Sequence, residues 1–354
     1  MPQLYTKLPS LYHRLLPELA QREVPAETFA TCDNCVLCQK EGSPYLGTKC
    51  CTYYPELPNY LIGGILQDER PEMQEGKRRL RAIIASRLGV TPYGLVHPFQ
   101  YALLDKTIRN SRQNQYDWTR EEVATLRCPF YNQGWCTVWD YREHCCSTHF
   151  CTSVGGEAGQ KFWNALDEHL LSIEQSLSRH ALLELSFPVE QLQSQRVASD
   201  KLNLDNAIGQ VNEPTYSQLW GTWAGREEEL YQMAYQCIST LSQQEVMRTL
   251  GVQGELQYKQ LAHWQRAFLQ PEIPEHLSLN KELKVEPLPT GEVELKTSAG
   301  SFKVPGLVYR MLLKLDTNYT VDSLEESLAP FGFHFKQEYL HTLFFMKVVV
   351  PAEA

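Results

Sequence analysis

The placement of cysteine constrains this chain more than any other feature of its sequence. Ten of the eleven cysteines lie between residues 32 and 151, and only Cys237 lies outside that interval. They form two groups: Cys32, Cys35, Cys38, Cys50 and Cys51 come first, and Cys128, Cys136, Cys145, Cys146 and Cys151 follow. Random placement would have spread them along the whole chain. We therefore predict that the two groups fold together around metal, which supplies folding free energy to the first 155 residues.

The expected cellular setting supports metal rather than disulfide chemistry. The N-terminus lacks the basic start and unbroken apolar core of a secretory signal, and no apolar run approaches the roughly 18–20 residues needed to span a bilayer. We expect a cytoplasmic protein without a membrane partner, in which thiols stay reduced. Disulfides could still account for ten cysteines, although this setting disfavours them. A net charge of −9 argues against a generic nucleic-acid binder, because affinity for phosphate comes mainly from Lys and Arg.

The spacing of the first group favours an iron–sulfur cluster. Thiolates are soft ligands that suit Zn²⁺ or iron–sulfur clusters. Cys32, Cys35 and Cys38 have C-x2-C-x2-C spacing, which is that of a loop wrapping a cubane whose fourth ligand is a remote cysteine. The other cysteines suffice for a second site. We expect one or two iron–sulfur clusters, with 4Fe–4S favoured and zinc as the alternative. Adjacent cysteines cannot easily reach one metal together, so each such pair would divide between sites or leave one thiol free.

Polar residues next to the second group are the candidates for catalysis. His144 and His149 flank an adjacent cysteine pair; a packing or surface role is the commoner one for such histidines. They could instead complete a mixed Cys/His site or transfer protons, because histidine titrates near neutral pH. Arg142 and Glu143 are the remaining catalytic candidates. The aromatic residues nearby are expected to shield the metal from water: Trp135, Trp139 and Tyr141.

Hydrophobic periodicity predicts an α+β chain that is mainly helical. Helices are expected over 77–89, ending at Gly89, and at 162–177 and 230–241, with Cys237 as a small buried residue of the last one. The arginines of the first helix would face solvent or hold an anionic ligand. Thr119 is a candidate N-cap, and residues 153–159 read as a flexible connection.

The last part of the chain has a different sequence pattern from the helical part before it. Residues 283–288, 292–297 and 301–304 read as short strands, 306–316, 320–328 and 336–346 as helices, and 348–350 as a closing strand. This order suggests a winged-helix-like module. We therefore divide the chain into a metal-binding domain (1–155), a helical domain (156–278) and this module (279–354).

Two family resemblances extend these expectations. The Cys50–Cys51 pair, followed by C-P-F-Y-x3-W-C-T-V-W-x2-R-x2-C from Cys128 and a further cysteine at 151, resembles the YkgJ-like cysteine-cluster family over residues 30–155. That family is described as zinc- or iron-chelating, and flagellin lysine methylases carry a related pattern. The sequence differs in having Glu143 where the family tends to have proline, and in a longer spacing between Cys38 and Cys50.

The C-terminal pattern is similar to the small PqqD-like winged helices that present peptides to modifying enzymes. The resemblance implies a peptide or protein partner, bound by adding a strand to an exposed sheet edge. A winged helix that only packs on its neighbours or forms a dimer is the alternative. DNA recognition is disfavoured, because residues 336–346 offer few of the Arg, Lys or Asn side chains of a reading helix.

Three functions remain open from the sequence. The first is an iron–sulfur (or zinc) enzyme that modifies a peptide or protein held by the C-terminal module. The second is a non-catalytic, metal-stapled scaffold or adaptor, and the third is an electron-transfer partner of another enzyme. The sequence contains no P-loop, dinucleotide fingerprint, nucleophile elbow or H-E-x-x-H motif, which makes a free-standing nucleotide-binding or hydrolase fold an unattractive explanation.

Overall fold

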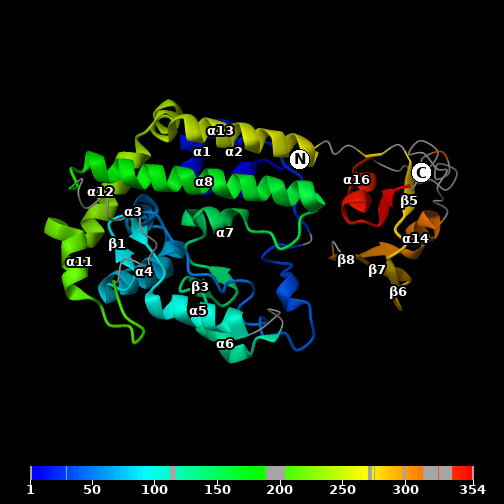
Figure 1. Ribbon diagram of the computed structural model, residues 1–354, viewed down its shortest axis with the longest axis horizontal. Helices are drawn as coiled ribbons and strands as arrows, with labels where there is room; N and C mark the ends of the chain where they lie inside the picture. Colours follow the sequence, from blue (N-terminus) through cyan, green and yellow to red (C-terminus); the bar gives the residue numbers. More distant parts are fainter. Residues whose placement is uncertain are drawn as a thin grey trace.

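The computed structural model describes residues 2–28, 30–111, 117–188, 204–269, 273–274, 276–297, 300–313, 326 and 337–352. Helices form most of it, and the strands pair only in small antiparallel sheets, which confirms the α+β, mainly helical class (Figure 1). In this part of the chain, every helix is too short or too polar to cross a membrane.

Four helices form the centre of the helical body: α3 (Asn59–Gln67), α8 (Gly156–Glu184), α12 (Glu227–Ser239) and α13 (Gln243–Leu269). α8 lies along α13, and α3 packs on α12 (Figure 1). The apolar positions predicted for α8, from Phe162 to Leu177, are all buried, as the helical period requires. α3 is buried over its first eight residues. A Cβ on Gly63 would collide with the main chain of Tyr231, so the glycine permits the close approach of α3 to α12.

The other helices and strands that precede the C-terminal module lie around this centre. They are α1 (Ser10–Leu15), α2 (Pro17–Ala20), α4 (Gln74–Ser86), α5 (Phe99–Ser111), α6 (Arg120–Thr125), α7 (His144–Thr148), α11 (Glu213–Trp220), the strand pairs β1 (Val90–Thr91) with β2 (Gly94–Leu95) and β3 (Tyr131–Asn132) with β4 (Trp135–Cys136), and single 3₁₀ turns at Leu4–Thr6, Val36–Cys38, Pro71–Met73, Trp139–Tyr141 and Gly221–Trp223.

Of three local predictions, one is confirmed and two are corrected by the structure. Thr119 caps α6 in a capping box with Glu122, as predicted for this N-cap. α4 ends at Ser86, three residues before the predicted stop, because Arg87 already adopts a left-handed backbone with φ 60°. Residues 153–159 are not a loose connection: α8 begins at Gly156, and the buried Ser153 hydroxyl donates to Glu27 (Oγ to Oε1, 2.6 Å).

One hydrophobic core runs from Leu4 to Phe268 and includes side chains of both α3 and α8. The expected boundary at residue 155 therefore lies within a shared core. A second core begins at Leu277 and ends at Val349, close to the expected start of the C-terminal module.

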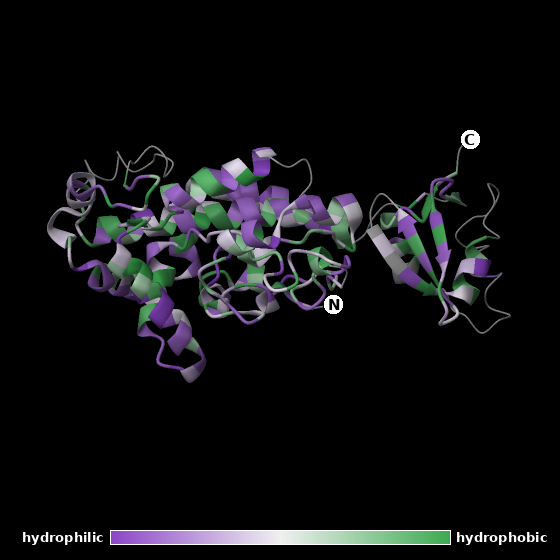
Figure 2. Cartoon of the chain, turned by 90° about the horizontal axis from the view of Figure 1, so that it is seen from below, coloured by the Kyte–Doolittle hydropathy of each residue, from purple (hydrophilic) through white to green (hydrophobic). Residues whose placement is uncertain are grey.

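The C-terminal module contains a three-stranded meander and a separate strand pair. β6 (Lys284–Pro287), β7 (Glu292–Thr297) and β8 (Gly300–Pro305) are antiparallel neighbours, and β5 (Leu277–Leu279) pairs with β9 (Val349–Pro351). Buried and partly buried residues alternate along β7, and the strands of this module carry alternating hydrophilic and hydrophobic residues (Figure 2). α14 (Gly306–Leu312) and α16 (Gln337–Phe345) fall on predicted helices. The helix predicted over 320–328 lies outside the described residues, apart from Glu326.

Candidate metal centre

The first cysteine group lies in a loop with little regular structure. Between residues 31 and 57 the only described helix is the single turn at Val36–Cys38. The Cys38 amide donates to Cys35 O at 2.9 Å, and the Cys38 thiol lies 3.3 Å from Tyr45 O. The loop is held by a third apolar cluster, in which Leu37 and Tyr45 meet Ile108 of α5 and Val123 of α6 together with Cys35. Helices α5 and α6 thus provide the support on which the thiols are placed.

The second cysteine group lies against the first in the structure. The Cys128 amide donates to Cys51 O at 2.8 Å, although these residues are far apart in the sequence. Side-chain hydrogen bonds link the thiol of Cys35 to those of Cys38 and Cys50. Electrostatic effects then connect the rest: Cys35 acts on Cys151, Cys50 on Cys145, Cys32 on Cys136, Cys136 on Cys128, and Cys128 on Cys146. All eleven cysteines are free.

The packing of these thiols disfavours their ionisation in the absence of a cation. Burial raises the pKa of Cys38 to about 11, and the Cys35 thiol adds to the effect. Burial likewise raises the pKa of Cys128 to about 12. The hydrogen bond from Cys35 lowers the pKa of Cys50, but the Cys51 thiol and burial outweigh it and raise that pKa to about 12. A bound metal ion would supply the positive charge that holds such thiols as thiolates, so this donor set fits a soft metal.

The spacing of the ligand atoms distinguishes two kinds of site. Within the described parts of the chain, one group of three Cys, His, Asp or Glu ligand atoms lies within 4.8 Å of one another, and it contains no cysteine: Glu143, His144 and Glu174. Four thiolates at roughly 2.3 Å from one zinc ion would place their sulfurs about 3.8 Å apart. The described thiols are therefore spread more widely than in a closed, mononuclear four-thiolate zinc site.

Arg142 is buried between the second cysteine group and a cavity. Its guanidinium donates to Trp139 O at 2.6 Å and to Lys7 O, and stacks on the Trp139 ring at 4.0 Å. Burial lowers the pKa of Arg142, while nearby Cys136 and Cys146 act in the opposite direction. The cationic side chain is thus held beside the thiols by main-chain carbonyls rather than by a carboxylate hydrogen bond.

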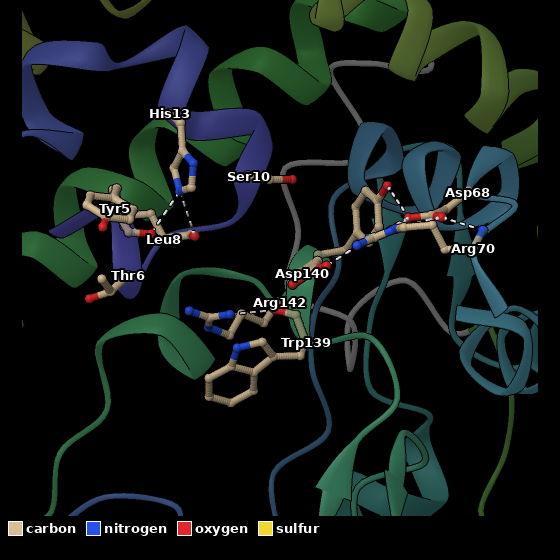
Figure 3. Close-up of a pocket in the computed structure, with 11 residues that line it drawn as sticks. Tyr5, Thr6, Leu8, Ser10, His13, Asp68, Arg70, Trp139, Asp140 and Arg142 are labelled. Carbon is tan, nitrogen blue, oxygen red and sulfur yellow. Dashed lines mark hydrogen bonds and ion pairs between the residues drawn. The ribbon is translucent and has the colours of Figure 1, made fainter. Parts of the chain in front are cut away.

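The cavity beside Arg142 has a volume of about 470 Å³ (Figure 3). Its wall carries an ion-pair chain in which Arg70 joins Asp68 at 2.7 Å to Asp140 at 2.8 Å, and Tyr141 donates to Asp68 at 2.9 Å. The paired charges give the cavity a polar wall that suits a small polar ligand.

The aromatic shield predicted around the second group is wrong in part. Trp135 is 72% exposed and Trp139 is 43% exposed, whereas Tyr141 is buried. Both tryptophans instead lie near cations, since Lys49 approaches the Trp135 ring and Arg142 stacks on Trp139. Cys237 is also half-buried rather than buried.

The two candidate histidines have different surroundings. His149 Nε2 lies 3.6 Å from the Cys151 sulfur, and burial lowers the pKa of this imidazole. His144 Nδ1 is hydrogen-bonded to Asp167 at 2.8 Å, and its Nε2 lies 3.3 Å from Glu143 Oε2. Glu143 also caps α7, accepting the amides of Cys145 and Cys146 at 2.7 and 2.9 Å. Glu143 and His144 thus belong to a carboxylate–imidazole cluster as well as to the helix that carries two thiols.

Glu174 and Asp167 of α8 complete this cluster and were not found from the sequence. Glu174 is buried and accepts a hydrogen bond from Tyr12 at 3.1 Å. The sequence could have indicated Glu174, because this carboxylate lies on the apolar face of α8, four residues after Leu170 and three before Leu177. Asp167 is partly exposed and had no such sign.

Comparisons with protein-family models, curated proteins and solved structures gave no match for this chain.

Proposed function

We propose that the chain is an iron–sulfur metalloprotein whose two cysteine groups bind one or two clusters, and that it modifies a peptide or protein held by the C-terminal module. The observation that carries the proposal is the meeting of the two groups at the Cys128–Cys51 main-chain hydrogen bond, together with the linked thiols of Cys35, Cys38 and Cys50 within the first group. Such a cluster would supply one-electron chemistry. The resemblance to the cysteine-cluster family points the same way.

The distribution of thiols supports iron–sulfur over zinc. The interactions join the ten thiols of both groups into one network: Cys32 interacts with Cys35 as well as Cys136, and Cys146 interacts with Cys145 as well as Cys128. The network has enough thiols for two four-thiolate centres, and among the described residues no three of its sulfurs come within 4.8 Å of one another. A polynuclear cluster needs thiolates that are spaced around a larger core than a single ion.

The C-terminal module supports a peptide partner. β6 and β8 are the outer strands of the meander, so each offers a free edge to an added strand in the described sheet. A cavity of about 920 Å³ also lies where α8 and α13 approach α16 and β9. Its lining combines aromatic residues such as Trp264 and Phe344 with the cations Lys161, Arg266 and Lys347, a composition that suits a peptide with acidic side chains.

The scaffold function remains the second candidate because one observation favours it. The loop from residue 31 to 57 has almost no regular structure among its described residues, so a metal could serve there only to fix the backbone. A purely structural centre would be fully ligated and would leave no position for substrate.

The deciding measurement is iron, zinc and acid-labile sulfide analysis, with an absorption spectrum, on full-length protein purified without oxygen. Stoichiometric iron and sulfide with absorption near about 400 nm would support the iron–sulfur proposal. A colourless protein with one or two zinc ions would refute it and favour the scaffold. Bleaching of the absorption by an added peptide would favour the enzyme over an electron-transfer partner.

Three cysteine variants test which residues bind the metal. We expect Cys35→Ser, Cys128→Ser and Cys136→Ser each to lower metal content and solubility together. Cys237→Ser is the matched control, because this thiol lies on α12 outside both cysteine groups, and it should keep full metal content. Unchanged loading in all three test variants would contradict the ligand assignment.

A further inference from the structure

We propose that Glu143, His144 and Glu174 form a second metal site, for a divalent transition metal such as Mn²⁺ or Fe²⁺, whose ligands are carboxylates and an imidazole. One ligand atom from each residue lies within 4.8 Å of the other two. This inference does not depend on the cysteine assignment, because none of its ligands is a thiol.

The spacing of the ligand atoms fits a bound ion. Two ligand atoms that each lie about 2.1 Å from one ion are about 3.0 Å apart at a right angle and about 3.4 Å apart at a tetrahedral angle. His144 Nε2 and Glu143 Oε2 are 3.3 Å apart, within that interval. The Glu174 carboxylate belongs to the same compact group from the opposite element, α8.

Neighbouring groups hold each ligand in place. Asp167 accepts from His144 Nδ1 at 2.8 Å and from the Thr148 hydroxyl at 2.9 Å, which leaves Nε2 facing the cluster. A carboxylate behind the distal nitrogen is the usual support of a metal-binding histidine. Glu174 is oriented by the Tyr12 hydroxyl, and Glu143 by the two amides at the start of α7. Every carboxylate oxygen retains a lone pair for an ion.

Two ionised carboxylates are costly in this buried cluster unless a cation pairs with them. Glu143 is 0% exposed and Glu174 is 3% exposed, so water cannot solvate either carboxylate. The imidazole of His144 is the one basic side chain paired with them in the described contacts. A divalent ion would neutralise both buried carboxylates. Ser147, one turn after the N-cap Glu143, has a buried hydroxyl with no hydrogen-bond partner among the described residues, a feature that a nearby ion or water would explain.

The donor set determines the kind of metal. Two carboxylates and one imidazole are harder ligands than thiolates and suit Mn²⁺, Fe²⁺ or Zn²⁺. Three protein ligands leave coordination positions for a bound water or another donor. Because Cys145 and Cys146 directly follow His144 on α7, the site would lie beside the proposed soft-metal centre.

Titration with Mn²⁺ tests the proposal, because this ion prefers oxygen and nitrogen ligands to thiolates. Full-length protein with its native metals would be titrated while the electron paramagnetic resonance signal of free Mn²⁺ is recorded. We expect one Mn²⁺ per chain. Glu174→Gln should abolish this binding, and Asp167→Asn, which alters a positioning residue, should weaken it by about 10- to 100-fold.

Glu227→Gln is the matched control. Glu227 is also buried and accepts hydrogen bonds, from Tyr216 and from the Gly225 amide, but it belongs to α12 and should not affect Mn²⁺. The proposal is overturned if the wild type does not bind millimolar Mn²⁺, or if Glu174→Gln and Asp167→Asn bind it as tightly as the wild type. Iron and sulfide would be measured in the same samples. Their absence, with Mn²⁺ binding intact, would refute the proposed function and leave this site standing.

Discussion

Replacing Arg79 with methionine should weaken the attachment of the segment that follows Cys128 to the helical body. Arg79 of α4 donates to the carbonyls of Pro129 and Tyr131 at 2.8 and 3.0 Å, and to Asn132 Oδ1 at 3.2 Å. It also pairs with Glu75 at 2.6 Å. These acceptors immediately follow Cys128, so a single guanidinium fixes the segment that places this thiol.

The size of the effect follows from the bonds that are lost. A hydrogen bond to a charged group contributes about 1.5–3 kcal/mol, and the side chain of Arg79 is 25% exposed, so the lower figure applies to each carbonyl bond. Loss of two such bonds should lower the free energy of unfolding by about 3 kcal/mol. Methionine keeps most of the apolar stem, so the loss reflects hydrogen bonds rather than packing. Urea unfolding monitored by circular dichroism would measure the change, with metal content determined on the same samples.

Arg78→Met is the internal control. Arg78 is the next residue on α4, but its side chain is 66% exposed and pairs with Glu75 alone in the described contacts. Exposed ion pairs contribute little, so this variant should resemble the wild type in both stability and metal content. If Arg79→Met and Arg78→Met unfold at the same urea concentration with the same metal content, the anchoring role of Arg79 is wrong.

Two further predictions concern the helical body. Gly63→Ala should destabilise the protein by about 2 kcal/mol in urea unfolding, because overpacking against the Tyr231 main chain outweighs the gain in helix propensity of about 1 kcal/mol. Gly47→Ala is the control, because a Cβ there meets nothing within 4 Å, and it should have no comparable effect. Equal stabilities of the two variants would refute the close-packing argument. Burial lowers the pKa of His169 from 6.5 to about 4, so the unfolded chain binds a proton at a pH where the native imidazole does not. Stability should therefore fall by about 2 kcal/mol from this group between pH 7.5 and pH 5, and His169→Leu should remove that part of the pH dependence; identical slopes for both proteins would contradict it.

The elements that the sequence predicted well are those determined by local periodicity or capping. The apolar repeat from Phe162 to Leu177 specifies one face of α8, and Thr119 with Glu122 specifies the start of α6. The end of α4 was misplaced because a glycine is the usual stop, whereas here Arg87 adopts the left-handed conformation itself.

The sequence singled out the thiols of the candidate site, but not the residues that hold them in place. Cysteine ligands can be predicted from residue type and spacing, whereas the sequence does not indicate which partner a charged helical residue will bind. Arg79 could be assigned a role only when its distance to the Pro129 and Tyr131 carbonyls was known. The exposure of Trp135 likewise depends on which side of the β3–β4 hairpin faces solvent, and two-residue strands contain too little alternation to indicate it.

The two proposed metal sites explain why a carboxylate follows Arg142. In a helix of five residues, α7 must present Cys145 and Cys146 while satisfying the free amides at its start. A proline at position 143 could not accept those amides, but the Glu143 carboxylate accepts both and still faces His144 and Glu174. The same side chain would therefore couple the position of two thiols to the occupancy of the Glu143–His144–Glu174 site. Binding of a metal at either site should then stabilise α7 for the other, and this coupling is a physical reason for glutamate at this position.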